Sequence, residues 1–208
     1  MDTRSEHNNG AAQRWRENSD RLAAIIRPLS EPDYQCDTRW LDFRPYLERL
    51  AEDYGAVDLC PDFQRGHVWS PFQQQHFLEN VLKGVVPNTA LFVQFNCSNW
   101  NDVKPGHELP AGLQCVDGLQ RISAVYAFLD GKVKPFGLCV DDLDYSRYSL
   151  RGPQFTFRVA IHAFQRRAEL LDYYLALNAG GTPHSDDEIE RVRGLLAAAT
   201  SAEGADGR

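Results

Sequence analysis

Hydrophobic and polar positions repeat along the chain with periods that predict helices in some segments and strands in others. The run SPFQQQHFLENVLKG, residues 70–84, predicts a helix. Ser70 is a favourable N-cap, Pro71 follows at the first helical position, Gln73 completes a capping box, and Gly84 lies past the end. The residues expected on its core-facing side are Phe72, Phe77, Leu78, Val81 and Leu82.

The same periodicities place the other elements. Helices are expected over residues 13–29, 43–54, 163–181 and 185–199, the second ending at Gly55 and the last beginning with a capping box of Ser185 and Glu188. Strands are expected near residues 57–60, 90–95, 115–116 and 154–161. This irregular mixture predicts an α+β fold, a small mixed sheet with packed helices. Residues 1–12 and the tail from 200 to 208 are polar and are expected to be disordered.

The segment CVDGLQRISAVYAFLDG, residues 115–131, runs from a strand into a helix. Asp117 is the expected N-cap, with Gln120 at N3 as its capping-box partner. An apolar stripe then docks the helix on the sheet: Ile122, Val125, Tyr126 and Leu129. A well-capped core helix accounts for Asp117, Gly118 and Gln120 without any ligand.

Arg121 does not fit that simple explanation. A helix N-terminus carries a partial positive charge and unpaired N–H groups, so an arginine there adds like charge to like. A bound anion would turn this electrostatic repulsion into attraction, because N–H groups and a guanidinium together form a phosphate site. Arg121 is therefore either a phosphate ligand or a plain surface arginine.

Three further fragments carry polar residues suited to chemistry. PDFQRGHVW places Gln64 and Arg65 after a proline at a strand edge, where a surface role is the alternative. LNAGGTPHSDDE joins a helix end to a Gly180–Gly181 turn, which forms either an anion-holding nest or an ordinary glycine stop. DDLD, residues 141–144, is either a divalent cation site or a solvated acidic loop.

Composition narrows the function classes. The net charge of −7 argues against a general nucleic-acid binder. The five cysteines are far apart and form no C-x-x-C pair, which predicts free thiols in a cytoplasmic protein. No apolar run has the length of a signal peptide core or of a membrane span, so no membrane association is expected. There is no P-loop motif and no clustered histidine pair of an HNH nuclease.

Taken in order, PDFQRGHVW, ENVLKGVVPN, VDGLQRISAVYAFLDG and LNAGGTPHSDDEI resemble the DGQQR-motif family, domain-of-unknown-function family 262. Its best-known members form the N-terminal half of GmrSD-type restriction enzymes that attack modified DNA. The resemblance runs from about Asp42 to Leu196 and implies a ParB/sulfiredoxin-like fold. It divides the chain into an N-terminal segment with a helix (1–40), the family domain (41–199) and a tail (200–208).

The resemblance also implies a site. The DGQQR motif, implicated in binding and hydrolysis of a nucleoside triphosphate, falls on Asp117, Gly118, Leu119, Gln120 and Arg121. Two further family motifs fall on Pro61, Phe63, Gln64, Arg65 and Trp69, and on Asn178, Gly180, Gly181 and Thr182. Leu119 replaces a motif glutamine, so phosphate binding is better supported than turnover. All three stretches are expected to converge on one cleft.

The resulting prediction is a stand-alone nucleotide-binding switch module in DNA-related defence, counter-defence or mobile-element biology. Asp117 and Arg121 are its candidate catalytic residues if the nucleotide is hydrolysed, and Mg²⁺ would then be required. DNA or a separately supplied effector protein are the expected partners. Two alternatives remain open: a hydrolytically silent module that binds protein or DNA, and a stand-alone nuclease. Redox chemistry at Cys115 is disfavoured because it lies on a buried-type strand.

Overall fold

A computed structural model describes residues 3–64, 66, 68–87, 91–178 and 186–206. The chain divides into two compact units, Met1–Ser30 and Glu31–Arg208. The first unit contains a single helix, α1 (Thr3–Ile26), which begins earlier than the sequence pattern predicts. Residues 3–12, expected to be disordered, are therefore helical. None of the described helices combines the length and the apolar composition needed to span a membrane.

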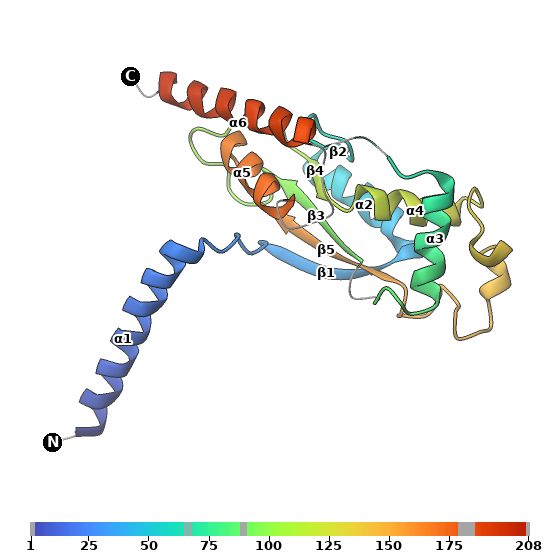
Figure 1. Ribbon diagram of the computed structural model, residues 1–208, viewed down its shortest axis with the longest axis horizontal. Coiled ribbons are helices and arrows are strands. Elements are labelled where there is room, and N and C mark those ends of the chain that lie inside the picture. Colours follow the sequence, from blue (N-terminus) through green and yellow to red (C-terminus); the bar gives the residue numbers. More distant parts are fainter. Residues whose placement is uncertain (1–2, 65, 67, 88–90, 179–185, 207–208) are drawn as a thin grey trace. The chain divides into compact units, whose positions relative to one another are not determined.

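The second unit is built on one five-stranded mixed sheet (Figure 1). Its strands are β1 (Tyr34–Arg39), β2 (Val57–Asp58), β3 (Phe92–Cys97), β4 (Leu113–Asp117) and β5 (Thr156–His162). Their order is β1-β5-β3-β4-β2. The inner pair β3–β5 and the edge pair β2–β4 are parallel, while β1–β5 and β3–β4 are antiparallel. This confirms the predicted α+β class with helical flanks.

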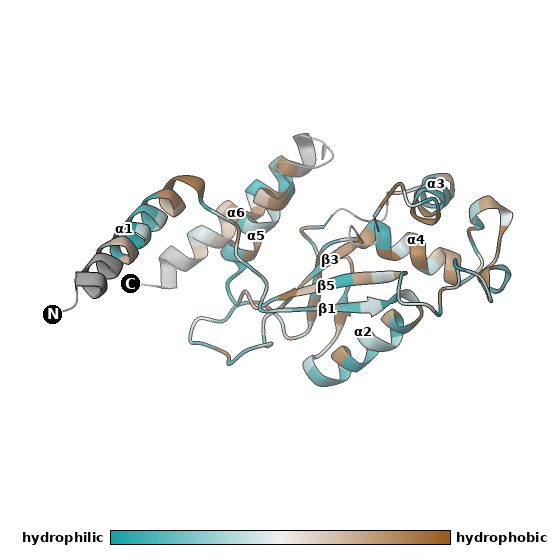
Figure 2. Cartoon of the chain, turned by 90° about the horizontal axis from the view of Figure 1, so that it is seen from below, coloured by the Kyte–Doolittle hydropathy of each residue, from teal (hydrophilic) through white to brown (hydrophobic). Residues whose placement is uncertain are grey.

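Helices cover the sheet. They are α2 (Trp40–Tyr54), α3 (Pro71–Leu82), α4 (Leu119–Leu129), α5 (Arg167–Asn178) and α6 (Asp186–Asp206), with short 3-10 turns η2 (Pro135–Gly137) and η3 (Asp141–Leu143). α6 includes residues 200–206, which were expected to lie in a disordered tail; at the start of this stretch the hydroxyls of Thr200 and Ser201 donate to Leu196 O and Ala197 O of the preceding turn. Figure 2 shows mixed teal and brown residues along α2 and α4, as expected for helices with one buried side.

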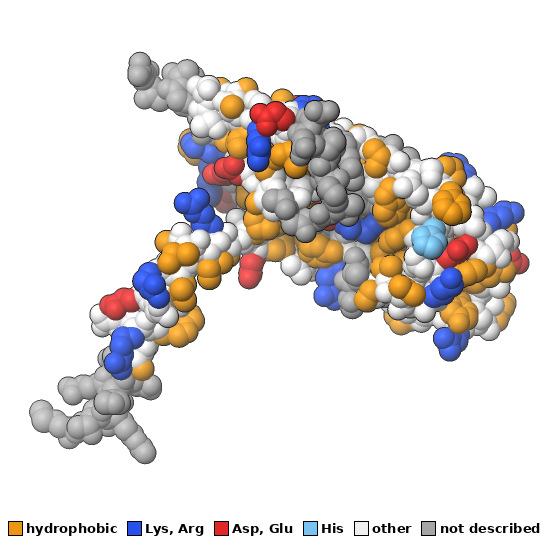
Figure 3. All heavy atoms as spheres, viewed as in Figure 1, with side chains coloured by type: hydrophobic (Ala, Val, Ile, Leu, Met, Phe, Trp, Pro, Cys, Tyr) orange, Lys and Arg blue, Asp and Glu red, His pale blue; other side chains and the backbone are white. Residues whose placement is uncertain are grey.

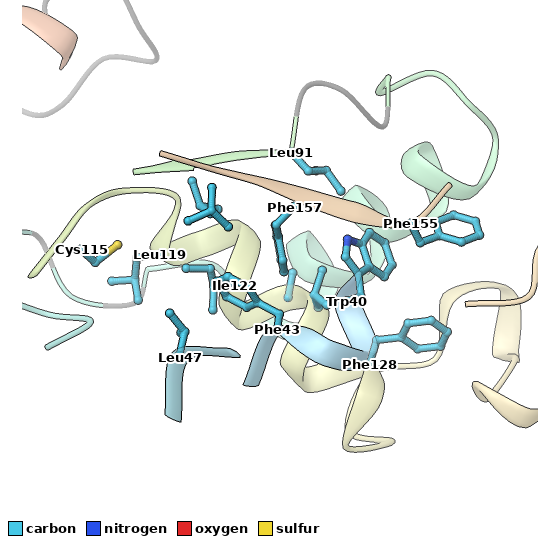
Figure 4. Close-up of a cluster of buried hydrophobic side chains, with 14 of the residues drawn as sticks. Trp40, Phe43, Leu47, Leu91, Cys115, Leu119, Ile122, Phe128, Phe155 and Phe157 are labelled. Atoms are coloured by element: carbon cyan, nitrogen blue, oxygen red, sulfur yellow. The ribbon is translucent and has the colours of Figure 1, made fainter. Parts of the chain in front are cut away.

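Two separate cores lie on the two faces of the sheet. The larger unites α2, α3 and α4 with β3, β4 and β5, and its centre includes Trp40, Phe43 and Phe157 (Figure 4). The smaller unites α5 and α6 with Phe63 and Val116. β4 contributes to both, because successive side chains of a strand point to opposite faces. Each buried aliphatic or phenylalanine side chain contributes roughly 1.5–3 kcal/mol to this packing.

The predicted start of α3 is confirmed in detail. The Ser70 hydroxyl accepts from the Gln73 amide, and the Gln73 side chain accepts from the Ser70 amide at 2.9 Å. α2 ends at Gly55 as expected. Phe72, however, was expected in the core and is 77% exposed. α3 packs through Gln74, Leu78 and Val81, which places Phe72 on its outward side.

Candidate functional site

β4 turns into α4 through one glycine. Gly118 has φ +105° and serves as the N-cap of α4, without a side-chain capping hydrogen bond. An added Cβ would lie 2.6 Å from Val93 Cγ1 and 3.1 Å from Val93 Cα. Glycine is required there both for the backbone conformation and for the close approach of α4 to β3. The first turn of α4 therefore begins directly beside the sheet.

The prediction that Asp117 caps this helix is wrong, because the left-handed Gly118 shifts the helix start by one residue. The Asp117 carboxylate instead accepts a hydrogen bond from Arg121 Nη2, forming an ion pair one helical turn apart. The side chains of Arg121 and Asp117 are 26% and 36% exposed. The aspartate thus offsets the positive charge that Arg121 adds to the helix N-terminus.

Arg121 keeps one unsatisfied donor. Its Nε is buried and has no hydrogen-bond partner among the residues that the structure describes. A buried donor without an acceptor costs about 1–3 kcal/mol, so such groups usually mark a ligand or water position. The ion pair with Asp117 therefore accounts for part of the guanidinium only.

Gln64 connects the loop of residues 61–69 to the β4–α4 junction by hydrogen bonds. Its Nε2 donates to the main-chain oxygens of Cys115, at 3.2 Å, and Val116, at 2.7 Å. The neighbouring Phe63 is fully buried against Tyr174 of α5, with ring centroids 5.3 Å apart. The loop is therefore held between β4 and α5.

Gln120 completes the attachment from the other side. Its Oε1 accepts from the amides of Val68, at 3.2 Å, and Trp69, at 3.1 Å, and its Nε2 donates to Gly66 O at 3.2 Å. Both glutamines, expected at the site, join the 61–69 loop to the junction: Gln64 reaches from the loop to the main chain of β4, and Gln120 reaches from α4 to the main chain of the loop. Arg65, which this loop carries, lies outside the described residues.

The third predicted stretch is described only at its start. Asn178 is the last residue of α5, and its Nδ2 donates to Tyr174 O at 2.7 Å. Gly180, Gly181, Thr182 and the predicted cap Ser185 lie outside the described residues. Contact of Tyr174 with Phe63 nevertheless brings the C-terminal half of α5 beside the loop that Gln64 anchors.

A buried polar cluster behind the junction was not predicted. Gln94 faces Asp117 across the β3–β4 register, and its Oε1 accepts from the Tyr173 hydroxyl at 2.7 Å. His162 Nε2 lies 3.1 Å from the same oxygen. Burial, and then the Asp117 carboxylate, raises the pKa of Tyr173, while burial lowers that of His162. The signal in the sequence is the polar residue Gln94 within an apolar strand.

A comparison with protein families shows that the sequence of residues 47–174, more than half of the chain, matches the family described as GmrSD restriction endonuclease, N-terminal domain. The chain belongs to this family. No curated protein and no solved structure matches it. The GmrSD match contains the 61–69 loop and the β4–α4 junction, and it ends before Asn178.

Cys115 and the DDLD segment, the other residues of this GmrSD-family chain considered for chemistry, are engaged in its own packing and hydrogen bonds. Burial raises the pKa of the Cys115 thiol strongly, which keeps it protonated and unreactive. In the DDLD segment, Asp142 accepts from the Cys139 amide at 2.8 Å, and Asp144 pairs with Arg151. Among the described residues, no three His, Cys, Asp or Glu side chains form a metal-binding group.

The two glutamines give a test of how this GmrSD-family loop is held. Gln120→Ala should lower the free energy of unfolding by about 1–3 kcal/mol, because three main-chain groups lose their partner. Hydrogen exchange of the Val68 and Trp69 amides should accelerate. Gln13→Ala is the control: the side chain of Gln13 donates to Glu17 on an exposed helix surface, and its loss should cost less than about 0.5 kcal/mol. Unchanged exchange at Val68 and Trp69 would mean that another contact holds the loop.

Proposed function

We propose that this chain is a nucleotide-binding switch module of a DNA restriction or defence system, with the triphosphate bound at the β4–α4 junction. One observation carries the proposal: Arg121 lies in the first turn of α4 with a buried Nε that has no partner among the described residues. Helix N-terminal N–H groups and a guanidinium are complementary to phosphate oxygens.

The roles proposed for the individual residues follow from their contacts. Arg121 and the main-chain N–H groups of the first turn of α4 would contact phosphate. Gln64 and Gln120 would act indirectly, since their side chains hold the loop that carries Arg65. The Asn178–Thr182 stretch, with Gly180 and Gly181, would close the site as the family motif implies.

Asp117, which pairs with Arg121, is the carboxylate at the junction that could bind a metal ion in place of this pair. If the nucleotide is hydrolysed, Mg²⁺ would neutralise phosphate charge and be held by Asp117 together with the phosphates. Leu119, which replaces the motif glutamine, is 7% exposed and packs in the larger core. It supplies no polar group to the site. We therefore propose nucleotide binding as the main activity, and hydrolysis only as an additional one.

The direct test is calorimetric titration with each of the four ribonucleoside triphosphates and the matching nucleosides, with and without Mg²⁺. At least one triphosphate should bind about tenfold or more tightly than its nucleoside, because the candidate ligands suit phosphate rather than base. Phosphate release measured on the same samples separates binding from hydrolysis. Equal affinity for nucleoside and triphosphate would refute the phosphate site.

The alternatives predict different results in the same samples. A hydrolytically silent interaction module would bind none of the nucleotides. A nuclease would nick plasmid DNA with a divalent metal and lose this activity on substitution of Asp141 and Asp142. Nuclease activity is disfavoured by the structure of residues 141–144, where Asp142 accepts a hydrogen bond from Cys139 and Asp144 pairs with Arg151.

A further inference from the structure

The main chain of Asp62 and Phe63 is held by a residue of the last helix. Arg191, in the second turn of α6, donates from Nη1 to Asp62 O and from Nη2 to Phe63 O, the latter at 3.0 Å. These two carbonyls directly precede Gln64 and Arg65. One guanidinium therefore spans two successive peptide groups, and this use of its forked donors distinguishes arginine from lysine.

The helix α5 holds the same two residues through other contacts. Arg167, the first residue of α5, forms an ion pair with the Asp62 carboxylate at 2.5 Å. The Phe63 ring is fully buried and packs on Tyr174, with the ring centroids 5.3 Å apart. Asp62 and Phe63 are thus attached to both α5 and α6.

The segment between these two helices carries the third stretch that was expected at the nucleotide site. α5 ends at Asn178 and α6 begins at Asp186, so residues 179–185, which contain the Gly-Gly-Thr sequence, connect the two helices. Arg191 belongs to the helix that follows this segment. Its hydrogen bonds therefore link the 61–69 loop to the helix that comes directly after the glycine-rich stretch.

The attachment of α6 to the rest of the second unit does not depend on Arg191. Val192 and Ala199 are buried, and Leu195 and Leu196 pack against the same smaller core. Burial of these aliphatic groups is the main force that holds the helix in place. Loss of the Arg191 side chain should therefore leave α6 docked and release only the loop.

Arg193 provides a comparison on the same helix. It pairs with Glu190 at 3.5 Å, and the two side chains are 65% and 76% exposed. Figure 3 shows acidic and basic side chains next to one another on the side of α6 that faces the viewer. Exposed pairs of this kind contribute little to stability. Arg193 has the same charge as Arg191 two positions away, and it is therefore a matched control.

We propose that Arg191 is a positioning residue of the nucleotide site: it fixes the main chain before Gln64 and Arg65, so that Arg65 and the Gly180–Gly181 stretch face one triphosphate. This inference rests on the proposed function, and Arg191 itself would not touch the nucleotide. Arg191 lies beyond the family match, which ends at residue 174. If the loop keeps its binding conformation for only part of the time, the apparent affinity falls by that fraction.

The first measurement is hydrogen exchange of the full chain without nucleotide. Arg191→Ala should accelerate exchange of the Gln64 amide, which donates a turn hydrogen bond within the loop, by about tenfold. The amides of Val68 and Trp69 should keep their rates, because Gln120 holds them independently of α6. A residue that only stabilised the fold would instead protect all three amides alike.

The second measurement is calorimetric titration with ATP, GTP, CTP and UTP in the presence of Mg²⁺. For each triphosphate that the wild-type chain binds, Arg191→Ala should weaken binding about tenfold, as expected if the loop holds its binding conformation in about a tenth of the molecules. Arg191→Lys keeps the charge without the fork and should give an intermediate affinity. Arg193→Ala should stay within about twofold of the wild type. Circular dichroism verifies that each variant is folded.

The possible failures of these experiments are distinguishable. A wild-type chain that binds none of the four triphosphates would defeat the proposed function and this inference with it. If the wild type binds but Arg191→Ala binds equally well, or if Arg193→Ala loses as much affinity, the positioning role alone is overturned. Equal acceleration of exchange at Gln64, Val68 and Trp69 would also overturn it, since Arg191 would then serve the stability of the whole fold.

Discussion

Arg121→Ala is expected to weaken triphosphate binding at least tenfold, whichever nucleotide the titration identifies. A charge-assisted hydrogen bond to phosphate contributes about 1.5–3 kcal/mol, and the variant removes every such bond that this side chain makes. Calorimetry measures the loss. Arg158→Ala is the matched control, because it also breaks an arginine–aspartate pair, with Asp37, but on the β1–β5 edge of the sheet. It should leave nucleotide affinity unchanged.

The stability of Arg121→Ala separates a ligand role from a structural one. The pair with Asp117 is partly exposed, and such pairs contribute about 0–1 kcal/mol. Removing a cation from a helix N-terminus recovers a few tenths of a kcal/mol. The unfolding midpoint of the nucleotide-free protein should therefore move by only a few degrees. A loss above about 2 kcal/mol would show that Arg121 serves mainly as the structural partner of Asp117.

Gly118→Ala should destabilise the fold by about 2–5 kcal/mol. The left-handed backbone costs a non-glycine residue about 1–2 kcal/mol, and the new Cβ would overlap Val93, including its backbone, which adds about 1–3 kcal/mol. Denaturant unfolding measures the change. Gly131→Ala isolates the first effect, since Gly131 also has positive φ, +70°, but no atom lies within 4 Å of an added Cβ; the difference between the two variants therefore measures the overlap with Val93. If both variants lose the same free energy, α4 can move away from β3 at no cost.

Local signals predicted local structure well. The capping box of α3 and the glycine end of α2 depend on residues within one turn, so the sequence carries them directly. Phe72 was placed wrongly because a helix with apolar residues on two sides does not reveal which side meets the core. That choice depends on the packing of α3 through Gln74 and Leu78, which is a long-range property.

The candidate site was predicted only in part, because local sequence signals do not carry the long-range contacts that build it. Convergence of the 61–69 loop with the β4–α4 junction came from the family resemblance, and the contacts of Gln64 and Gln120 bring those segments together. Asp117 was misassigned because Gly118 changes the helix start. The cluster of Gln94, His162 and Tyr173 joins residues far apart in sequence, and no local pattern encodes such a meeting.

The parallel pairing of β3 with β5 has a consequence for synthesis of the chain. β3 is almost wholly buried, yet its neighbour β5 ends at His162, so β3 lacks one side of its ladder until that residue has left the ribosome. For that interval an apolar strand with an unpaired edge is exposed to other nascent chains. Yield in the cell should therefore depend on translation speed and on chaperones that bind extended apolar segments.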